Sequence, residues 1–541
     1  MRPLPALTPE THDFWTGGEH DELRIPRCAD CGLWLHPSQT VCPECHAANL
    51  EYSPIGKGGV VVGLSVNHQP WGNGLELPYV VAIVELDDAP AVRLTTNLVN
   101  VDLVDARVGL SVRAVFEHHD DVWLPMFEPS GRPDQPGHVE LPAAEVRAPV
   151  STDRFEHRSA LTGIGMSQVG RRLMRPAAAL AVEASLAAVA DAGLELSDID
   201  GLSTYPGMLG MGMSEGGIPT LEESLRIRPT WFNGGMEIPG QGGAVVAAML
   251  AVSAGLCRHV LCVRTVWEAT FAALLKTGQA QPMGGGRASG DQQWRVPYGA
   301  VSAATFIGMI AAQYLDRFGA DREVLGRIAV NARAGAVRNP GAVYRDPMSM
   351  DDYFGARLVS TPFGLYDCDV PCDGAVAIVV SAAETAGDCR HGGVRVEAVG
   401  TQITERVSWD QGTITHEPQV FGPAAHLWSR SALSRADVDV ALLYDGFTFN
   451  CVSWLEALGF CGIGEAADWI GDGSRIALGG ELPLNPHGGQ LSAGRLHGFG
   501  FLHEAVTQLR GDAGERQVND AEVAVVSTGG GTPGGCFLLT K

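Results

Sequence analysis

Four cysteines near the start of the chain place the tightest constraint on its fold. Cys28 and Cys31 form one Cys-x2-Cys pair, Cys42 and Cys45 form another, and ten residues separate the pairs. Two close thiolate pairs can complete a tetrahedron around one zinc ion. Because no histidine or carboxylate replaces a thiolate, no coordination position stays open, and the site is predicted to be structural. A rubredoxin-type iron site is the weaker alternative.

The segment after the cysteines is rich in β-branched residues. Its apolar runs 60–62, 79–84 and 111–116 are separated by glycine, proline and asparagine turns. Short strands with this punctuation are typical of a small OB-fold barrel. We therefore predict a helical start and zinc ribbon over residues 1–50, an OB-fold barrel over 51–128 and, from its composition, a linker over 129–154.

From about residue 155 the pattern changes to alternating helices and strands. An alanine-rich helix is predicted between Pro176 and Gly193, because proline favours the first turn of a helix and glycine its C-terminal cap. A second helix near 243–254 leads into the strand 259–263. Repeated alternation predicts an α/β core with central sheets. We divide this core into halves at 155–395 and 396–541, with a weak internal repeat.

Composition limits the class of protein and its partners. A chain of 541 residues with 45% hydrophobic and 18% charged residues describes a packed, multidomain globular protein. The net charge of -24 argues against a nucleic-acid partner but allows a local basic pocket for an anion. We find neither an apolar window of membrane-spanning length nor a signal-peptide core. We therefore expect no membrane span and a cytoplasmic protein whose cysteines stay reduced.

Glycine-rich motifs in the second part are similar to those of a known superfamily. They lie at 163–167, 367–375, 444–448, 485–489, 494–498 and 527–531. On these motifs, residues 155–541 resemble the lipid-transfer, or sterol-carrier, branch of the thiolase superfamily. The resemblance implies a thiolase-like layered αβαβα core. Residues 10–128 resemble the zinc-ribbon and OB-fold proteins that accompany such enzymes and act with them on acyl-CoA substrates.

The residues that carry thiolase chemistry are missing. A thiolase places its cysteine nucleophile at a helix start, where this chain has Gly240, and its histidine base in the late turn, where this chain has Arg495. Covalent acyl transfer needs an activated nucleophile and a base. Members of the branch without the cysteine act as retro-aldolases on β-hydroxyacyl-CoA intermediates of steroid side-chain breakdown. They tend to carry a tyrosine at the position of Arg495, so the acid–base assignment is open here.

Candidate catalytic residues come from the same turns. Tyr444 ends an apolar strand at the sheet edge where α/β sites gather, and we predict it as the acid–base residue. Asp445 would orient the phenol or act as a turn or cap residue. Either His497 or His487 would hydrogen-bond the thioester carbonyl, with a loop histidine in water as the alternative, and His497 is also a candidate to replace the thiolase base. Arg495 would lower the pKa of the phenol or hold a coenzyme A phosphate.

Further candidates lie in glycine-rich segments. Gly529 and Gly530 would form an oxyanion site from backbone N–H groups, or else a plain hairpin turn. Gly240 would border the coenzyme A site in the vacant nucleophile slot. Tyr298 is the reserve acid–base residue, in the second of two stretches, 206–217 and 276–299, that are either lids over an acyl group or long loops.

The leading hypothesis is an acyl-CoA carbon–carbon lyase that cleaves a β-hydroxyacyl-CoA into a ketone or aldehyde and a shorter acyl-CoA. An acyltransferase or thiolase with a displaced nucleophile is the second hypothesis, and a non-catalytic lipid or acyl-CoA binding protein is the third. A need for free coenzyme A separates the first two, and turnover separates both from the third. The resemblance further implies a homodimer through the thiolase-like part and an enoyl-CoA hydratase as a candidate partner.

Overall fold

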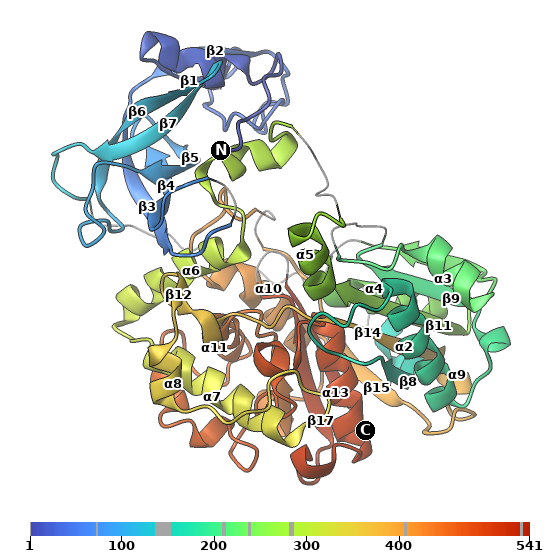
Figure 1. The fold of residues 1–541 in the computed structure, drawn as a ribbon. Coiled ribbons are helices and arrows are strands. Elements are labelled where there is room, and N and C mark those ends of the chain that lie inside the picture. The colour runs from blue at the N-terminus through green and yellow to red at the C-terminus, as the bar shows by residue number, and fades with distance from the viewer. Residues whose placement is uncertain are drawn as a thin grey trace.

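The computed structural model contains a zinc ribbon, a β-barrel and a large α/β core (Figure 1). It describes residues 2–71, 74–135, 153–207, 212–235, 240–280, 286–404, 408–530 and 534–541. The ribbon and barrel, in blue, lie at one end of the core beside α6 (Ala303–Phe318). The architecture predicted from the sequence is therefore present in full.

The ribbon follows a short apolar helix. Helix α1 (His12–Thr16) buries Phe14 and Trp15, and it is followed by a 3₁₀ turn at Gly17–His20. Strands β1 (Leu23–Cys28) and β2 (Leu50–Ile55) pair antiparallel, and the cysteine segment lies between them. The strand after residue 50 thus completes the ribbon before the barrel begins.

Five strands form the barrel, and part of the core extends its sheet. The pairing of β3 with β6 closes the barrel. At the other end of the same edge of β3, strand β12 of the core joins the sheet, and the Thr361 N–H donates to the Val66 carbonyl at 2.9 Å. Because the core covers this edge, β3 does not expose a free edge there. The strands are β3 (Gly58–Asn67), β4 (Tyr79–Leu86), β5 (Ala89–Leu98), β6 (Ser111–His119), β7 (Val122–Pro129), β12 (Leu358–Ser360) and β13 (Phe363–Gly364).

The core sheet shows an internal repeat in its strand order. The order is β10-β9-β11-β14-β8 in the first half and β15-β18-β17-β16 in the second, and the halves meet where β8 pairs with β15. Outward from the β8–β15 pairing, the first half runs β8, β14, β11 and β9, and the second half runs β15, β18, β17 and β16. In both halves the strand that comes first in the chain is followed by the last two strands of that half and then by its second strand. The strands are β8 (Ser159–Met166), β9 (Gly201–Tyr205), β10 (Trp231–Gly234), β11 (His259–Trp267), β14 (Asp373–Ala382), β15 (Val394–Gly400), β16 (Val440–Leu442), β17 (Val523–Thr528) and β18 (Gly535–Thr540).

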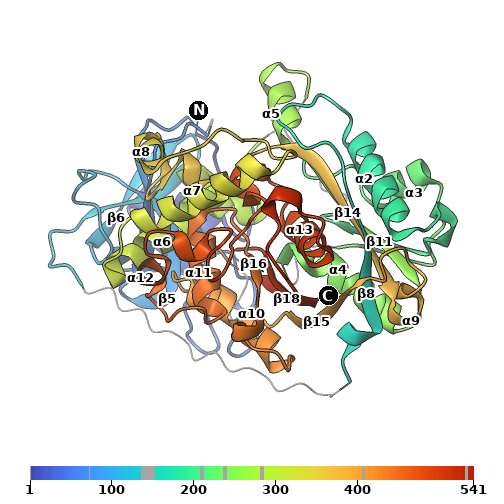
Figure 2. The ribbon, with the colours of Figure 1, turned by 90° about the horizontal axis from the view of Figure 1, so that it is seen from below.

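Strand alternation gives the layers. On β11, Leu261 and Val263 pack in one apolar cluster with α2, while Val260 and Cys262 pack in another with α4. Helix α2 runs between Pro176 and Gly193, as the sequence predicts. Figure 2 shows α13 in the middle of the core, and α13 contacts strands of both halves. The remaining helices are α2 (Ala177–Ala192), α3 (Ile218–Leu225), α4 (Gly243–Ser253), α5 (Glu268–Lys276), α7 (Glu323–Arg338), α8 (Met350–Gly355), α9 (Ala383–Ala386), α10 (Glu417–Ser429), α11 (Thr448–Ala457), α12 (Ala466–Ile470) and α13 (Gly498–Arg510).

No single helix within the described ranges has both the length and the apolar character needed to cross a membrane. One bent pair, Gly290–Tyr298 with Ala303–Phe318, reaches them together by length and composition only.

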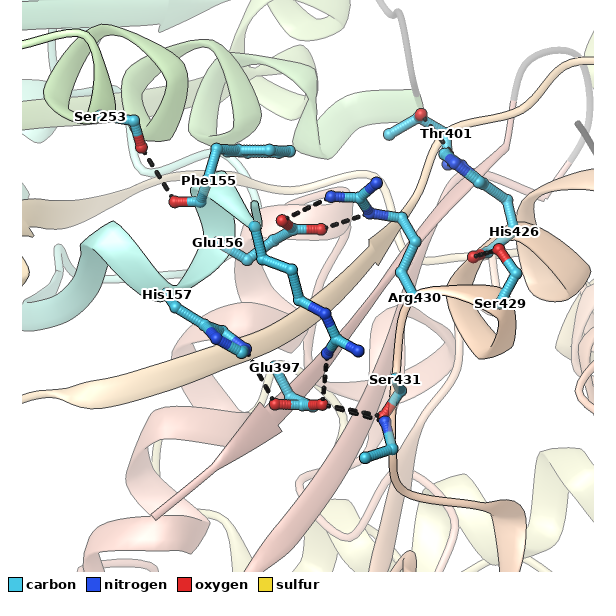
Figure 3. Close-up of polar contacts among 12 residues, drawn as sticks. Phe155, Glu156, His157, Ser253, Glu397, Thr401, His426, Ser429, Arg430 and Ser431 are labelled. Carbon is cyan, nitrogen blue, oxygen red and sulfur yellow. Dashed lines mark hydrogen bonds and ion pairs between the residues drawn. The ribbon is translucent and has the colours of Figure 1, made fainter. Parts of the chain in front are cut away.

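A buried ion pair ties the start of the core to the seam between its halves (Figure 3). Glu156 is fully buried, and its two carboxylate oxygens accept from Nε and Nη2 of Arg430 at 2.6 and 2.7 Å. The hydrogen bonds that Arg430 donates to Glu156 raise the pKa of Arg430. Next to this pair, Arg154 and His157 both contact Glu397 of β15, at 2.9 and 3.1 Å. The chain that emerges from the linker is thus fixed to the second half of the core.

We expect Glu156→Gln to lower the stability of the core by about 3 kcal/mol, because it leaves the half-buried Arg430 without a counter-charge. Thermal and urea unfolding would measure the change. The control is Arg158→Gln, which breaks the exposed pair of Arg158 with Asp153 and should leave stability almost unchanged. Equal stability of Glu156→Gln and wild type would contradict an anchoring role for this pair.

Candidate active site

The ribbon brings the four cysteines to the spacing of a metal site. The Sγ atoms of Cys28 and Cys45 are 3.5 Å apart, as are those of Cys31 and Cys42, and all four lie within 4.8 Å of one another. Tetrahedral zinc with bonds of about 2.3 Å places its sulfur ligands about 3.8 Å apart. The four thiols therefore fit one zinc ion with no position left for substrate, which is the structural type of site.

The nucleophile slot has no room for a side chain. Gly240 lies in a 3₁₀ turn, Gly240–Gly242, directly before α4, and its φ is +59°. A Cβ at Gly240 would lie 2.0 Å from the carbonyl oxygen of Thr528. A Cβ at Gly242 would lie 2.5 Å from the ring of Phe537. At the position that the sequence analysis assigns to the nucleophile, β17 and β18 therefore leave no space for a side chain.

Tyr444 stands beside this slot. It follows β16, is 8% exposed, and its hydroxyl accepts a hydrogen bond from Nε2 of Gln241 at 3.2 Å. Its backbone N–H donates to Oγ of Ser527 at 2.8 Å, and Gly446 lies against its ring. The catalytic role of Tyr444 stays a prediction. Gln241 was missed by the sequence analysis, although its position next to Gly240 could have indicated it.

Arg495 is close enough to Tyr444 to interact with it electrostatically. Its guanidinium forms ion pairs with Glu268 at 3.0 Å and with Asp369 at 3.1 Å. Desolvation alone would lower the pKa of Arg495, but the two carboxylates outweigh it and raise that pKa. Burial raises the pKa of Asp369 to about 7, against the opposing effect of Arg495. The Asp369 N–H donates to the Gly446 carbonyl at 3.0 Å, so this network adjoins the turn of Tyr444.

His497 lies between two guanidinium groups. Its Nδ1 accepts from Arg264 at 2.5 to 3.2 Å, and its Nε2 is 3.3 Å from Nε of Arg495. Burial and these two cations hold the pKa of His497 well below its usual range. A neutral imidazole has one acceptor nitrogen, so only one of the two contacts can be a hydrogen bond at a time. The two arginines therefore disfavour the protonated ring, and the expected contact of His497 with a thioester carbonyl stays a prediction.

Arg264 was not anticipated from the sequence. It is fully buried on β11, and its Nη1 also donates to the carbonyls of Met213 at 2.6 Å and Thr265 at 3.1 Å. The sequence places Arg264 within an otherwise apolar strand. Because an unpaired buried charge is costly, an arginine at such a position indicates a buried partner, and this could have identified Arg264.

Asp445 supports the backbone of the neighbouring turn. It is fully buried, and its carboxylate accepts from the Gln490 N–H at 2.7 Å and from Nδ2 of Asn485 at 3.2 Å. Burial raises the pKa of Asp445 to about 8. A Cβ at Gly489 would lie 1.8 Å from this carboxylate. The contacts favour the turn-supporting interpretation of Asp445, since they fix the π-helical turn Gly489–Ala493 that leads to Arg495.

His487 lines a small cavity behind the late turn. The cavity has a volume of about 80 Å³ and is also bordered by Gln490 and His497. Desolvation lowers the pKa of His487 to about 3, and its Nδ1 has no hydrogen-bond partner among the described residues. The His487 ring meets that of Phe501 at 5.5 Å between centroids, and Phe501 also adjoins Tyr444 at 6.1 Å.

The remaining predicted residues lie in different places. The carbonyl of Gly529 accepts from Nε1 of Trp454 at 2.8 Å, and that of Gly530 accepts from Asn450. An oxyanion role for the N–H groups of these glycines stays a prediction. Tyr298 is 2% exposed in the apolar cluster of the barrel, and burial raises the pKa of its phenol. The structure does not bring Tyr298 together with the other candidates.

The barrel module holds a loop of the core. Trp15 stacks on Trp294 with ring centroids 5.1 Å apart, and its Nε1 donates to Gln293 at 3.2 Å. The Ala288 N–H donates to the Leu4 carbonyl at 2.8 Å. Of the two predicted lid stretches, residues 208–211 and 281–285 lie outside the described residues. In the second stretch, residues 287–298 contact the ribbon and barrel.

Comparisons with known proteins agree with this architecture. Residues 15–51 match the family described as "ChsH2, rubredoxin-like zinc ribbon domain", residues 52–117 match "ChsH2, C-terminal OB-fold domain", and residues 409–535 match "Thiolase C-terminal domain-like". The chain thus combines a structural zinc ribbon and an OB-fold barrel with a thiolase-like core. This class of protein is the one that the sequence motifs predict.

Two curated relatives are 34% identical to the chain. One is the "Steroid side-chain-cleaving aldolase" of Thermomonospora curvata, matched over 70% of this chain and 97% of the relative. The other is the "17-hydroxy-3-oxo-4-pregnene-20-carboxyl-CoA lyase" of Mycobacterium tuberculosis, matched over 71% and 99%. The solved structure "Ltp2-ChsH2(DUF35) aldolase" is 31% identical with a TM-score of 0.62, over 71% of this chain and 98% of that one. The chain belongs to this family of thiolase-like aldolases, and the predicted enzyme class, an aldolase-type lyase, is confirmed.

Proposed function

We propose that this enzyme cleaves a β-hydroxyacyl-CoA by a retro-aldol reaction into a ketone or aldehyde and a shorter acyl-CoA. The single observation that carries the proposal is the Tyr444 hydroxyl at Gln241, next to a Gly240 slot that has no room for a nucleophile. The names of the relatives, an aldolase and a CoA lyase, support the same chemistry. They also support a steroid side-chain intermediate as the acyl group.

The reaction needs proton transfer and charge stabilisation but no covalent intermediate. Tyr444, as the phenolate, takes the proton of the β-hydroxyl, the oxygen forms a carbonyl, and the bond between Cα and Cβ breaks. The electron pair of that bond moves into the thioester enolate, which then takes the proton back from the Tyr444 phenol at Cα, so that the phenolate is regenerated. Arg495 supplies the positive charge next to the reacting groups, and its paired carboxylates, Glu268 and Asp369, hold it in place.

An acyltransferase with a displaced nucleophile has less support. Three cysteines of the core lie near the late turn and the Tyr444 turn: Cys372 and Cys451 are fully buried, and Cys368, which bridges to Phe447, is half-buried. Burial raises the pKa of all three thiols, which disfavours the reactive thiolate. A non-catalytic lipid or acyl-CoA binding protein remains the third hypothesis, and turnover decides it. An enoyl-CoA hydratase partner and a cytoplasmic location are kept as parts of the proposal that rest on the sequence alone.

We expect purified enzyme to cleave a steroid β-hydroxyacyl-CoA without added coenzyme A, because the enolate leaves already attached to its thioester. Mass spectrometry of products from a β-hydroxyacyl-CoA and from a β-ketoacyl-CoA, each with and without free coenzyme A, tests this. Cleavage of the β-ketoacyl-CoA alone, in strict dependence on coenzyme A, would show thiolase chemistry instead. Binding without any product would show a binding protein.

Tyr444→Phe should lower kcat by about 10²–10⁴-fold, because positioned proton transfer contributes that much and the substitution removes only the hydroxyl. Ring packing stays, so the melting temperature and the affinity for coenzyme A should hold. Steady-state kinetics with unfolding controls measures both. The matched control is Tyr353→Phe, which removes another buried hydroxyl, bonded to Asp367. If Tyr444→Phe turned over at the wild-type rate, another group would carry the proton.

We further propose that the enzyme is a homodimer through the thiolase-like core. Strand β10 pairs with β9 on one side and with no other strand in the described part of the chain, so one edge of the core sheet is open. Phe232 on this strand is 64% exposed, and Leu250 and Leu256 nearby in the chain are 49% and 56% exposed. An open strand with exposed apolar side chains is suited to pairing with a second copy.

Light scattering should give twice the chain mass of 57.1 kDa at micromolar concentration, since an obligate interface is large and apolar. Phe232→Arg should shift the mass toward one chain. Leu186→Arg, at an exposed position on α2, serves as the control and should leave the mass unchanged. A wild-type protein that is monomeric under these conditions would refute the dimer.

A further inference from the structure

Four arginines gather around or beside one tyrosine on a chain whose net charge is -24. Arg171 donates from Nη1 to the Tyr344 hydroxyl at 2.5 Å, and its guanidinium lies 5.9 Å from the ring centroid. Arg333 approaches the same ring to 5.4 Å. Arg345 and Arg338 follow on the same loop and at the adjoining end of α7. We call Arg171, Arg333, Arg338, Arg345 and Tyr344 the arginine patch.

No arginine of the patch forms an ion pair with a carboxylate in the described part of the chain, although Asp346 acts on Arg333 from a longer distance. Arg338 donates to the Ala334 carbonyl at 2.8 Å, and Arg345 donates to the Val337 carbonyl at 3.3 Å. Within the described ranges, none of the four arginines has a carboxylate oxygen within the 4.0 Å of an ion pair, whereas Arg175 nearby is paired with Glu183. In an acidic protein, cations grouped without a counter-ion produce a local field that favours an anionic ligand.

The arginine patch is connected to the late turn of the active site. The backbone N–H of Tyr344 donates to the Ser492 carbonyl at 2.9 Å, and that of Val343 donates to the Ala493 carbonyl at 3.2 Å. Arg333 donates from Nε to Oγ of Ser492 at 2.9 Å. These bonds hold the patch against the turn that continues into Arg495.

The small cavity of His487 lies between the patch and the late turn. Its lining includes Val169 and Gly341, from the two loops that carry Arg171 and Arg345, and also Gly494 and His497 of the late turn. His487 is 8% exposed, and its Nδ1 lacks a partner in the described part of the chain. An unpaired polar atom buried in such a cavity needs a ligand or a water molecule. The cavity is large enough for water, which would satisfy this nitrogen.

We propose that the arginine patch binds the phosphates at the nucleotide end of the acyl-CoA. This inference rests on the proposed function, since it assigns a subsite for the same substrate. The nucleotide end carries a pyrophosphate and a ribose 3′-phosphate, and arginine forks bind phosphate oxygens in pairs. Arg338 and Arg345 are exposed and make only carbonyl contacts, so they can turn to a phosphate without breaking an ion pair.

The test uses the double variant Arg338→Gln/Arg345→Gln in the full-length enzyme. We expect the Kd for adenosine 3′,5′-bisphosphate, measured by calorimetry, to rise about tenfold through the loss of two charge-assisted contacts. KM for the acyl-CoA should rise similarly with kcat unchanged. A substrate with the same acyl group on pantetheine, which lacks the nucleotide, should be cleaved as by wild type. Arg228→Gln, at an exposed arginine elsewhere in the core, is the matched control and should change none of these values.

Unchanged bisphosphate affinity in the double variant, or no bisphosphate binding by wild type, would overturn the assignment. Equal losses with the acyl-CoA and the pantetheine thioester would also overturn it, because they would show a structural role. A wild-type enzyme that cleaves no β-hydroxyacyl-CoA would refute the proposed function alone. The bisphosphate measurement needs no turnover and would still decide the patch.

Discussion

The close approach of Gly240 to the carbonyl of Thr528 is the constraint from which the site is built. With no Cβ at Gly240, the turn before α4 can press against the ends of β17 and β18. That contact places Gln241 where its amide reaches the Tyr444 hydroxyl. Any side chain at Gly240 would have to displace a strand of the core sheet. The lack of a side chain at Gly240 and the placement of the Tyr444 phenol therefore depend on the same packing of the turn against β17 and β18.

Charge around the late turn is balanced within a compact network. Arg495 is held by Glu268 and Asp369, and His497 is kept neutral by Arg264 and Arg495. Buried charges are stable only when they are paired and hydrogen-bonded, so each member depends on the others. The lowered pKa makes the imidazole of His497 a weak base, which favours the phenol as the acid–base group of the proposed reaction.

The sequence predicts the modules well and the site only in part. The cysteine spacing, the alternation of the strands and the residues that bound α2 each depend on local chemistry, and the structure confirms them. Tyr444 was found because it ends a strand in a recognisable turn. Arg264, Gln241 and Asp369 were not, because their roles arise from contacts between segments far apart in the chain. Tyr298 was assigned to the site as part of a lid, whereas its ring is buried in the barrel cluster, a contact with the first hundred residues that no local pattern encodes.

Because the barrel and the core are fused in one chain, the contact between them costs less entropy than it would between two proteins. Trp15 of the ribbon module stacks on Trp294 of the core loop, and β12 of the core extends the barrel sheet. Two separate proteins would have to lose translational and rotational freedom each time they formed these contacts. In a single chain the linker makes the association intramolecular, at a high effective concentration. The loop over residues 286–299 is then held against the ribbon and barrel whenever the chain is folded. No separate binding step between two proteins is needed to hold this loop in place.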